Sequence, residues 1–135
     1  MNFSSLAAFA AFTTGLIGEV DKAKHDALVK AAKIIEVEAK SVLGTDGYGW
    51  PALSPETKKT QPGMLLETGE MRDSIGHTVT ANEAHVGSDN DKAVWHELGT
   101  VKIPARSFLM GAAIHKRDEV VREIGEHIGK VITKG

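Results

Sequence analysis

The chain has 135 residues, of which 41% are hydrophobic and 25% charged, and its formal net charge is −2. This length suits a single domain, and the small negative charge provides no basic excess that would draw the protein onto DNA or anionic lipid. The sequence has no cysteine, which excludes disulfides, thiolate metal sites and cysteine nucleophiles.

The longest apolar run lies near the N-terminus, at residues 6–17, and reads LAAFAAFTTGLI. It is shorter than the about 20 residues that span a bilayer, and no Lys or Arg precedes it as in a secretory signal. We therefore expect a chain that is neither membrane-embedded nor exported. Residues 1–15 include Phe9 and Phe12 and form either an extra helical turn on the domain's own core or an arm that docks on a neighbouring subunit.

Apolar residues spaced by three or four predict a long amphipathic helix over residues 16–43. Gly44 is a typical position for its end, because glycine tolerates the left-handed conformation that closes many helices. At about 40 Å the helix is long for so small a domain, so part of its length should contact a partner. The apolar stripe comprises Leu16, Val20, Ala23, Ala27, Ala31, Ile35, Ala39 and Val42.

Residues 44–64 collect glycine and proline and are predicted to form a long loop. Loops of this length in compact domains are usually functional or disordered. Tyr48 and Trp50 are the natural aromatic anchors for a neighbouring protein. The alternative is that Trp50 folds back onto the sheet of its own domain.

A β-meander is predicted within residues 65–106. Ile75, His77 and Val79 alternate with smaller or polar residues, as in a strand with one buried face, and residues 84–88 suit a returning strand. Residues 93–96 fit a short helix or a strand equally well, and Pro104 favours extended backbone over residues 102–106.

A second amphipathic helix is predicted over residues 107–133, on the stripe Leu109, Ala113, Val120, Ile124, Ile128 and Val131. The order helix, loop, meander, helix predicts a single α+β domain over residues 1–135. Its N-terminal and C-terminal helices would pack on a small antiparallel sheet.

Histidines raise an alternative hypothesis, a small metal-dependent hydrolase that uses His77, His85 and His96. His96 and Glu97 also begin a zinc-protease pattern, but Thr100 stands where its second histidine is required. The sequence shows no nucleophile turn and no complete dinucleotide-binding motif, so we predict no catalytic residue, metal or cofactor. A cytoplasmic regulator that binds one host protein is the other alternative.

Four stretches in a fixed order resemble the bacteriophage virion-morphogenesis family. They are GWPALSPET at residues 49–57, LETGEMRDSI at 66–75, Val86-Gly87-Ser88, and WHELGTVKIPARSFL at 95–109. Met71, Leu98 and Ser107 depart from the usual leucine, phenylalanine and proline of the family pattern. The matching motif residues are Leu66, Thr68, Gly69, Arg72, Ile75, Trp95, His96, Glu97, Gly99, Thr100, Pro104, Arg106 and Phe108.

The resemblance implies a non-enzymatic part of the neck or upper tail of a lambda-like or Mu-like virion, assembled in the bacterial cytoplasm. Such a protein joins head to tail or completes the tail. It is expected to form a ring, most often of six subunits, between the capsid-side connector or stopper and the tail tube or terminator. DNA would pass through this ring without specific binding.

Under this interpretation the stretch from Trp95 to Leu109 is a structural corner. Arg106 is expected to pair with Glu97 or another acidic residue before the C-terminal helix. Trp95 and Phe108 are expected to fill the core beneath that turn.

Overall fold

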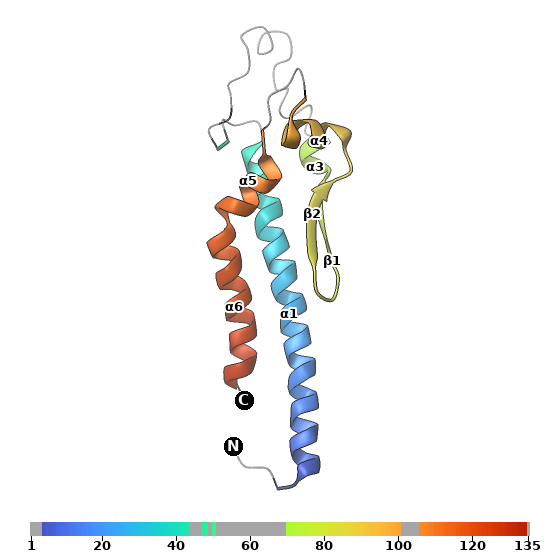
Figure 1. Cartoon of the computed structure of the whole chain (residues 1–135), viewed down its shortest axis with the longest axis vertical. Coiled ribbons are helices and arrows are strands. Elements are labelled where there is room, and N and C mark those ends of the chain that lie inside the picture. The colour runs from blue at the N-terminus through green and yellow to red at the C-terminus, as the bar shows by residue number, and fades with distance from the viewer. Residues whose placement is uncertain (1–3, 44–46, 49, 51–69, 101–105, 135) are drawn as a thin grey trace.

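The computed structural model describes residues 4–43, 47, 48, 50, 70–100 and 106–134. Within these ranges α1 runs most of the length of the molecule, α6 lies along one side of it, and the β1–β2 hairpin lies along another (Figure 1). This arrangement confirms the α+β class. The elements are α1 (Leu6–Val42), α3 (Glu70–Asp73), β1 (Ile75–Val79), β2 (Ala84–Ser88), α4 (Asp91–Leu98), α5 (Phe108–His115) and α6 (Arg117–Lys134).

Helix α1 begins ten residues before the predicted start. Ser5 is its N-cap, and the Ser5 hydroxyl accepts a hydrogen bond from the Ala8 N–H at 3.1 Å. Residues 6–15 therefore form the first turns of α1, and their docking on a neighbouring subunit stays a prediction. Their alanines and leucine favour helix strongly enough to carry the helix through Gly15 and Gly18, each of which costs about 1 kcal/mol relative to alanine.

Small side chains form the buried face of α1, as its sequence stripe predicted. Ala27, Ala32 and Ala39 are at most 1% exposed, and Ala23, Ala31 and Val42 are also buried. Because alanine ends at Cβ, both α6 and the hairpin can approach the α1 backbone closely. Helix α1 therefore packs against α6 on one side and against the β1–β2 hairpin on another.

The described residues contain two strands, not the three or more of a meander. Strands β1 and β2 pair antiparallel, with Ile75 opposite Ser88 and His77 opposite Val86. The segment that follows is helix α4, which Asn90 caps by accepting a hydrogen bond from the Lys92 N–H at 2.9 Å. This cap stabilises helix over strand. The predicted extended segment at residues 102–106 lies outside the described residues except for Arg106.

The predicted C-terminal helix is divided into α5 and α6 at Lys116. Backbone hydrogen bonds of 3.0 Å from Lys116 to Ala112 and 2.9 Å from Val120 to Lys116 continue across the junction. The division is therefore a change of direction at Lys116, which adopts φ −99° and ψ 7°. Helix α5 crosses the end of α1, and α6 then runs back along it (Figure 1).

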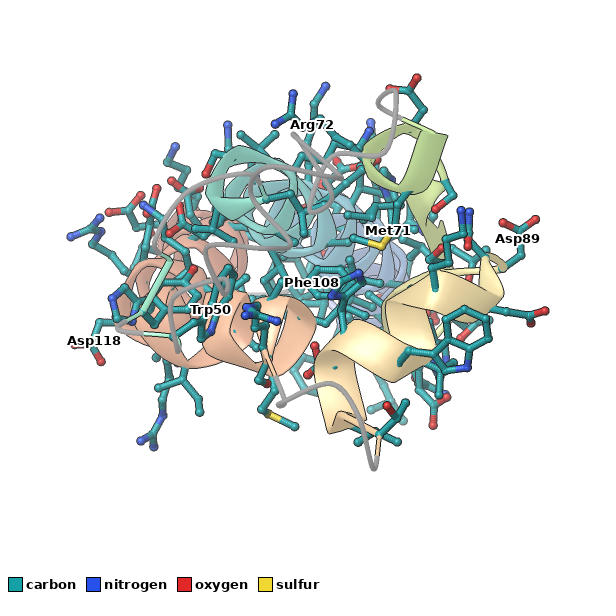
Figure 2. All side chains as sticks on the ribbon, turned by 90° about the horizontal axis from the view of Figure 1, so that it is seen from above. Trp50, Met71, Arg72, Asp89, Phe108 and Asp118 are labelled. Atoms are coloured by element: carbon teal, nitrogen blue, oxygen red, sulfur yellow. The ribbon has the colours of Figure 1, made fainter. Side chains whose placement is uncertain are left out.

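The main core lies at the C-terminal end of α1, where α3, β1, α4 and α5 meet. Figure 2 looks along the molecule from this end and shows Phe108 and Met71 near its centre. Both side chains are at most 1% exposed. Phe108 therefore fills the core as predicted. The buried cluster comprises Ala39, Val42, Leu43, Met71, Ile75, Ala93, Phe108 and Ala112.

Polar contacts fix the hairpin on α1 at two levels. Lys24 donates a 2.8 Å hydrogen bond to the Asn82 side chain at the hairpin turn. Further along α1, Glu36 accepts a 2.6 Å hydrogen bond from His77 Nδ1 and lies 3.1 Å from Lys40 Nζ. No described helix is both long enough and apolar enough to cross a membrane.

The pKa of Glu36 is lower than its ordinary value of 4.5. Burial acts to raise this pKa, but hydrogen bonds and attractive charge from His77 and Lys40 outweigh burial. A lowered folded-state pKa means that Glu36 stabilises the fold fully above its unfolded-state pKa. The stabilisation is lost as the pH falls through the folded-state pKa.

We expect Glu36→Gln to lower the free energy of unfolding at neutral pH by about 1–2 kcal/mol, because a charged acceptor is removed. Urea unfolding at decreasing pH below 4.5 should show the gap between wild type and variant closing. Glu83→Gln is the matched control: Glu83 contacts His85 with both side chains 68% exposed, and its loss should cost less than about 0.5 kcal/mol. A gap that is independent of pH would contradict this assignment.

Candidate functional site

The corner between α4 and α5 brings together residues that lie ten positions apart in the sequence. The Arg106 N–H donates a 2.6 Å hydrogen bond to the His96 carbonyl oxygen. Both residues are buried, His96 at 5% and Arg106 at 3% exposed. Gly99 ends α4 with φ 77°, a conformation that glycine adopts without strain, and its N–H donates to the Trp95 carbonyl. These contacts hold Arg106, immediately before α5, against the end of α4.

Glu97 is the main polar contact of this corner, and it caps α5 from outside that helix. One carboxylate oxygen accepts hydrogen bonds from the Ser107 hydroxyl at 2.7 Å and the Met110 N–H at 2.9 Å. The other accepts from the Leu109 N–H at 2.8 Å. A carboxylate at the N-terminus of a helix satisfies N–H groups that have no partner within the helix and interacts favourably with its dipole. The predicted pairing of Glu97 with Arg106 stays a prediction.

Trp95 was expected in the core, and this expectation is wrong. Its side chain is 46% exposed, whereas Ala93 and His96 are buried. Residues three apart share one face of a helix, so Ala93 and His96 face the core and Trp95 points away from it. The exposed face of α4 therefore presents Val94, Trp95 and Leu98.

The second and third family-like stretches meet next to this corner. Arg72 donates a 2.9 Å hydrogen bond to the Leu43 carbonyl at the end of α1, and Ile75 is buried at the start of β1. The hydroxyls of Ser74 and Ser88 lie 2.5 Å apart, and Ser88 also accepts from the Asn90 N–H at 3.0 Å. The hydrogen bond between Ser88 and Asn90 thus connects the end of β2 to the start of α4. Leu66, Thr68, Gly69 and Pro104 lie outside the described residues.

Tyr48 and Trp50, the predicted anchors for a partner, pack against the protein's own core cluster. The Tyr48 hydroxyl donates a 2.9 Å hydrogen bond to Glu38, and burial followed by this carboxylate contact raises the pKa of Tyr48. The rings of Tyr48 and Trp50 contact edge to face, with centroids 5.8 Å apart. Trp50 therefore folds back onto the domain. A contact with another protein stays a prediction for the exposed parts of both rings.

Gly111 on α5 explains how Tyr48 approaches so closely. A Cβ at this position would lie 2.5 Å from the Tyr48 ring, so only glycine leaves room for it. A glycine inside a predicted helix was the one sequence signal that could have indicated this contact.

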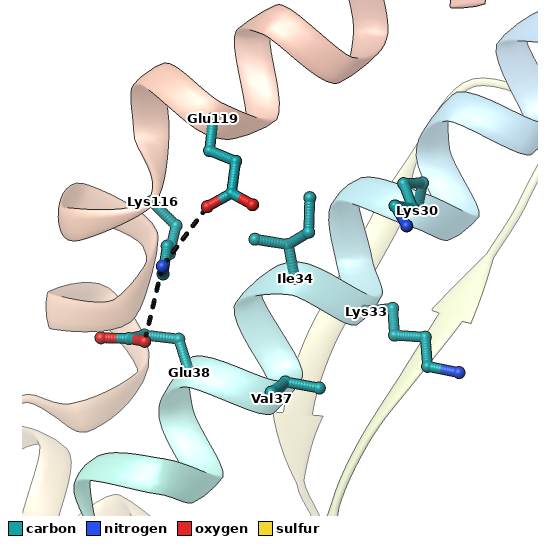
Figure 3. Close-up of a pocket in the computed structure, with 7 residues that line it drawn as sticks. All are labelled: Lys30, Lys33, Ile34, Val37, Glu38, Lys116 and Glu119. Atoms are coloured by element: carbon teal, nitrogen blue, oxygen red, sulfur yellow. Dashed lines mark ion pairs between the residues drawn. The ribbon is translucent and has the colours of Figure 1, made fainter.

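A groove between α1 and α6 lies beside the corner. Figure 3 shows Lys116 Nζ between Glu38 and Glu119, at 3.9 Å and 3.3 Å. Lys30, Lys33, Ile34 and Val37 line the rest of the groove. Glu38 thus connects α1 both to Tyr48 and to the bend between α5 and α6.

The three histidines of the alternative metal-site hypothesis do not come together in the structure. His85 pairs with Thr78, the neighbour of His77, so His77 and His85 point to opposite faces of the hairpin. His77 contacts Glu36 on α1, His85 contacts Glu83, and His96 is buried in α4. Across the described ranges, no group of three or more histidine or acidic side chains could hold a metal ion.

Comparison with known proteins gives one match. The model of the phage virion morphogenesis family matches residues 32–130, which begin in the C-terminal third of α1 and end in the last turns of α6. No curated protein and no solved structure matches the chain. The matched region contains α4, α5 and the C-terminal part of α1, on which α5 packs.

We expect Glu97→Ala to lower the free energy of unfolding by about 1–3 kcal/mol, because three donors at the start of α5 lose their acceptor. Hydrogen exchange at the Leu109 and Met110 amides should become faster before the rest of α5 is affected. Glu126→Ala removes an exposed carboxylate from α6 and serves as the charge-matched control. Unchanged protection of both amides in Glu97→Ala would show that the cap is not a stabilising contact.

Proposed function

The chain belongs to the phage virion morphogenesis family, and on this basis we propose that it joins head to tail or completes the tail in a tailed phage particle. Membership establishes a role in phage particle assembly. The neck or upper tail is the proposed position within that particle. The proposed assembly is a ring, with six subunits as the expected number.

The observation that carries this proposal is the extent of the family match. Residues 32–130 take in every element of the corner together with the part of α1 on which it packs. Two partly buried side chains contact the ends of helices: Arg72 donates to the Leu43 carbonyl at the end of α1, and Glu97 accepts from N–H groups at the start of α5. Such contacts fix the relative positions of helices, which is what a protein that works by presenting surfaces requires.

The proposed partners are other copies of the chain, the capsid-side connector or stopper, and the tail tube or tail terminator. A ring subunit meets its neighbour through two different surfaces, so ring closure depends on the angle between them. A rigid corner supports this role because it fixes the direction of α5 and α6 relative to α1. The net charge of −2 suits a ring through which DNA passes without being held.

Deletion of this gene from an otherwise intact set of particle genes tests the proposal. Electron microscopy of the lysate should show DNA-filled heads separate from tails, or tails of abnormal length or end structure. Supplying the wild-type chain from a second copy should restore joined, infectious particles. Glu126→Ala should restore them equally well, because its substitution lies on the exposed face of α6. Normal infectious particles without the gene would contradict the proposal.

A further inference from the structure

The groove between α1 and α6, shown in Figure 3, has a volume of about 310 Å³ and two ends of different charge. At the end next to the bend, Lys116 Nζ lies 3.9 Å from Glu38 and 3.3 Å from Glu119. This amine is therefore already compensated by carboxylates of the same chain. At the other end, α1 contributes Lys30 and Lys33.

These two lysines bring positive charge to the groove without an acidic partner. Both are exposed, and within the described ranges neither has an ion pair or a side-chain hydrogen bond. By contrast, Lys40 of the same helix lies 3.1 Å from Glu36. Residues 27–35 contain no acidic side chain. The uncompensated charge of this groove is therefore positive.

The same stretch of α1 lines the groove with two aliphatic side chains. Val37 is 57% exposed, and Ile34 points from α1 toward α6 (Figure 3). Lys30, Ile34 and Val37 follow the spacing of four and three that places side chains on one face of a helix. The groove thus combines an apolar surface with two adjacent ammonium groups.

The walls of the groove restrict the conformation of an occupant. The α1 wall is the interior of a long helix, whose backbone N–H and C=O groups bond within that helix. Backbone hydrogen bonds also continue through the bend at Lys116. An extended segment would therefore find few backbone partners for its own N–H and C=O groups, whereas a helix satisfies these groups internally.

We infer that this groove binds a helical segment of a partner protein in which carboxylates flank an aliphatic side chain. The carboxylates pair with Lys30 and Lys33, and the aliphatic side chain covers Val37. Complementary charge of this kind fixes the choice of partner and the speed of encounter more than the affinity. The inference rests on the proposed function and deepens it, because it states the chemistry that another virion protein presents to this chain.

DNA fits this groove less well than an acidic helix. A phosphate backbone would gain from the two lysines but not from the aliphatic surface of Ile34 and Val37. DNA also carries a charge at every phosphate, so it would meet Glu38 and Glu119 as well as the lysines. A protein helix can place its carboxylates opposite the lysines alone.

Binding of a model helix, followed by NMR, tests this inference without the particle. The probe is an acetylated and amidated peptide of about 15 residues, a length at which isolated helices begin to form in water, with glutamates on both sides of a leucine stripe. Titration with this peptide should shift the methyl signals of Ile34 and Val37, and added salt should weaken the binding. The same peptide with lysine in place of glutamate should leave both signals unchanged.

Charge reversal measures the contribution of the two lysines. Lys30→Glu/Lys33→Glu should weaken binding of the glutamate peptide about tenfold or more, since two attractive contacts become repulsive. Lys30→Gln/Lys33→Gln introduces good helix formers and should give a smaller loss in the same direction. Arg122→Glu/Lys130→Glu is the matched control: it changes the net charge equally at two exposed positions of α6 that do not line this groove. It should bind the peptide as tightly as the wild type.

Absence of shifts at Ile34 and Val37 with the glutamate peptide would overturn the inference, and so would an equal loss of binding in the control variant. Shifts that grow with protein concentration in the absence of peptide would assign the groove to a second copy of the chain instead. Larger shifts with a duplex oligonucleotide than with the peptide would assign it to DNA.

The binding result and the deletion phenotype are independent of each other. Peptide binding together with normal particles after gene deletion would keep the groove as a binding site and reject the joining role. Separate heads and tails without peptide binding would support the joining role and reject this groove as its contact.

Discussion

The close packing of α1 on two sides is the constraint on which the rest of the structure depends. Ala27, Ala32 and Ala39 bring neighbouring elements near the α1 backbone, and polar groups then fix their positions. Glu36 binds the hairpin through His77, and the Leu43 carbonyl accepts from Arg72. Near the other end of α1, Phe12 and Leu16 line a groove with Val131 of α6.

The order of the family-like stretches has a physical explanation in this corner. The stretch that contains Arg72 closes the end of α1, and its Ser74 meets Ser88 of the stretch that ends β2. Ser88 leads to the cap of α4, and Glu97 near the end of α4 caps α5. The second and third stretches therefore contact each other, and Glu97 of the fourth stretch caps α5. These contacts explain why the order of the three stretches carries more information than any one of them.

The sequence predicted the elements whose pattern is long and regular. The buried alanines of α1, the hairpin and the burial of Phe108 follow from periodicity or from the family resemblance. Short elements were harder to predict from the sequence. Residues 93–96 fit a helix or a strand, and the Asn90 cap in the structure decides for the helix. Trp95 was placed in the core on the family resemblance alone, but the helical period of α4 turns Ala93 and His96 to the core and leaves Trp95 exposed.

The contacts of the candidate site could be predicted only in part, because they join residues whose distance depends on the fold. Glu97 was expected at the corner, but its role as the cap of α5 depends on how α4 is oriented. Tyr48 was expected to face a partner, yet Gly111 leaves space for it on α5. The exposure of Leu6 and Ile17 could not be recognised from the sequence, since an apolar stripe does not show where its packing partners end.

Cryo-electron microscopy of intact particles tests the central claim most directly. The account predicts a ring of this chain at the junction of head and tail. Density for the chain elsewhere in the particle would contradict the joining role.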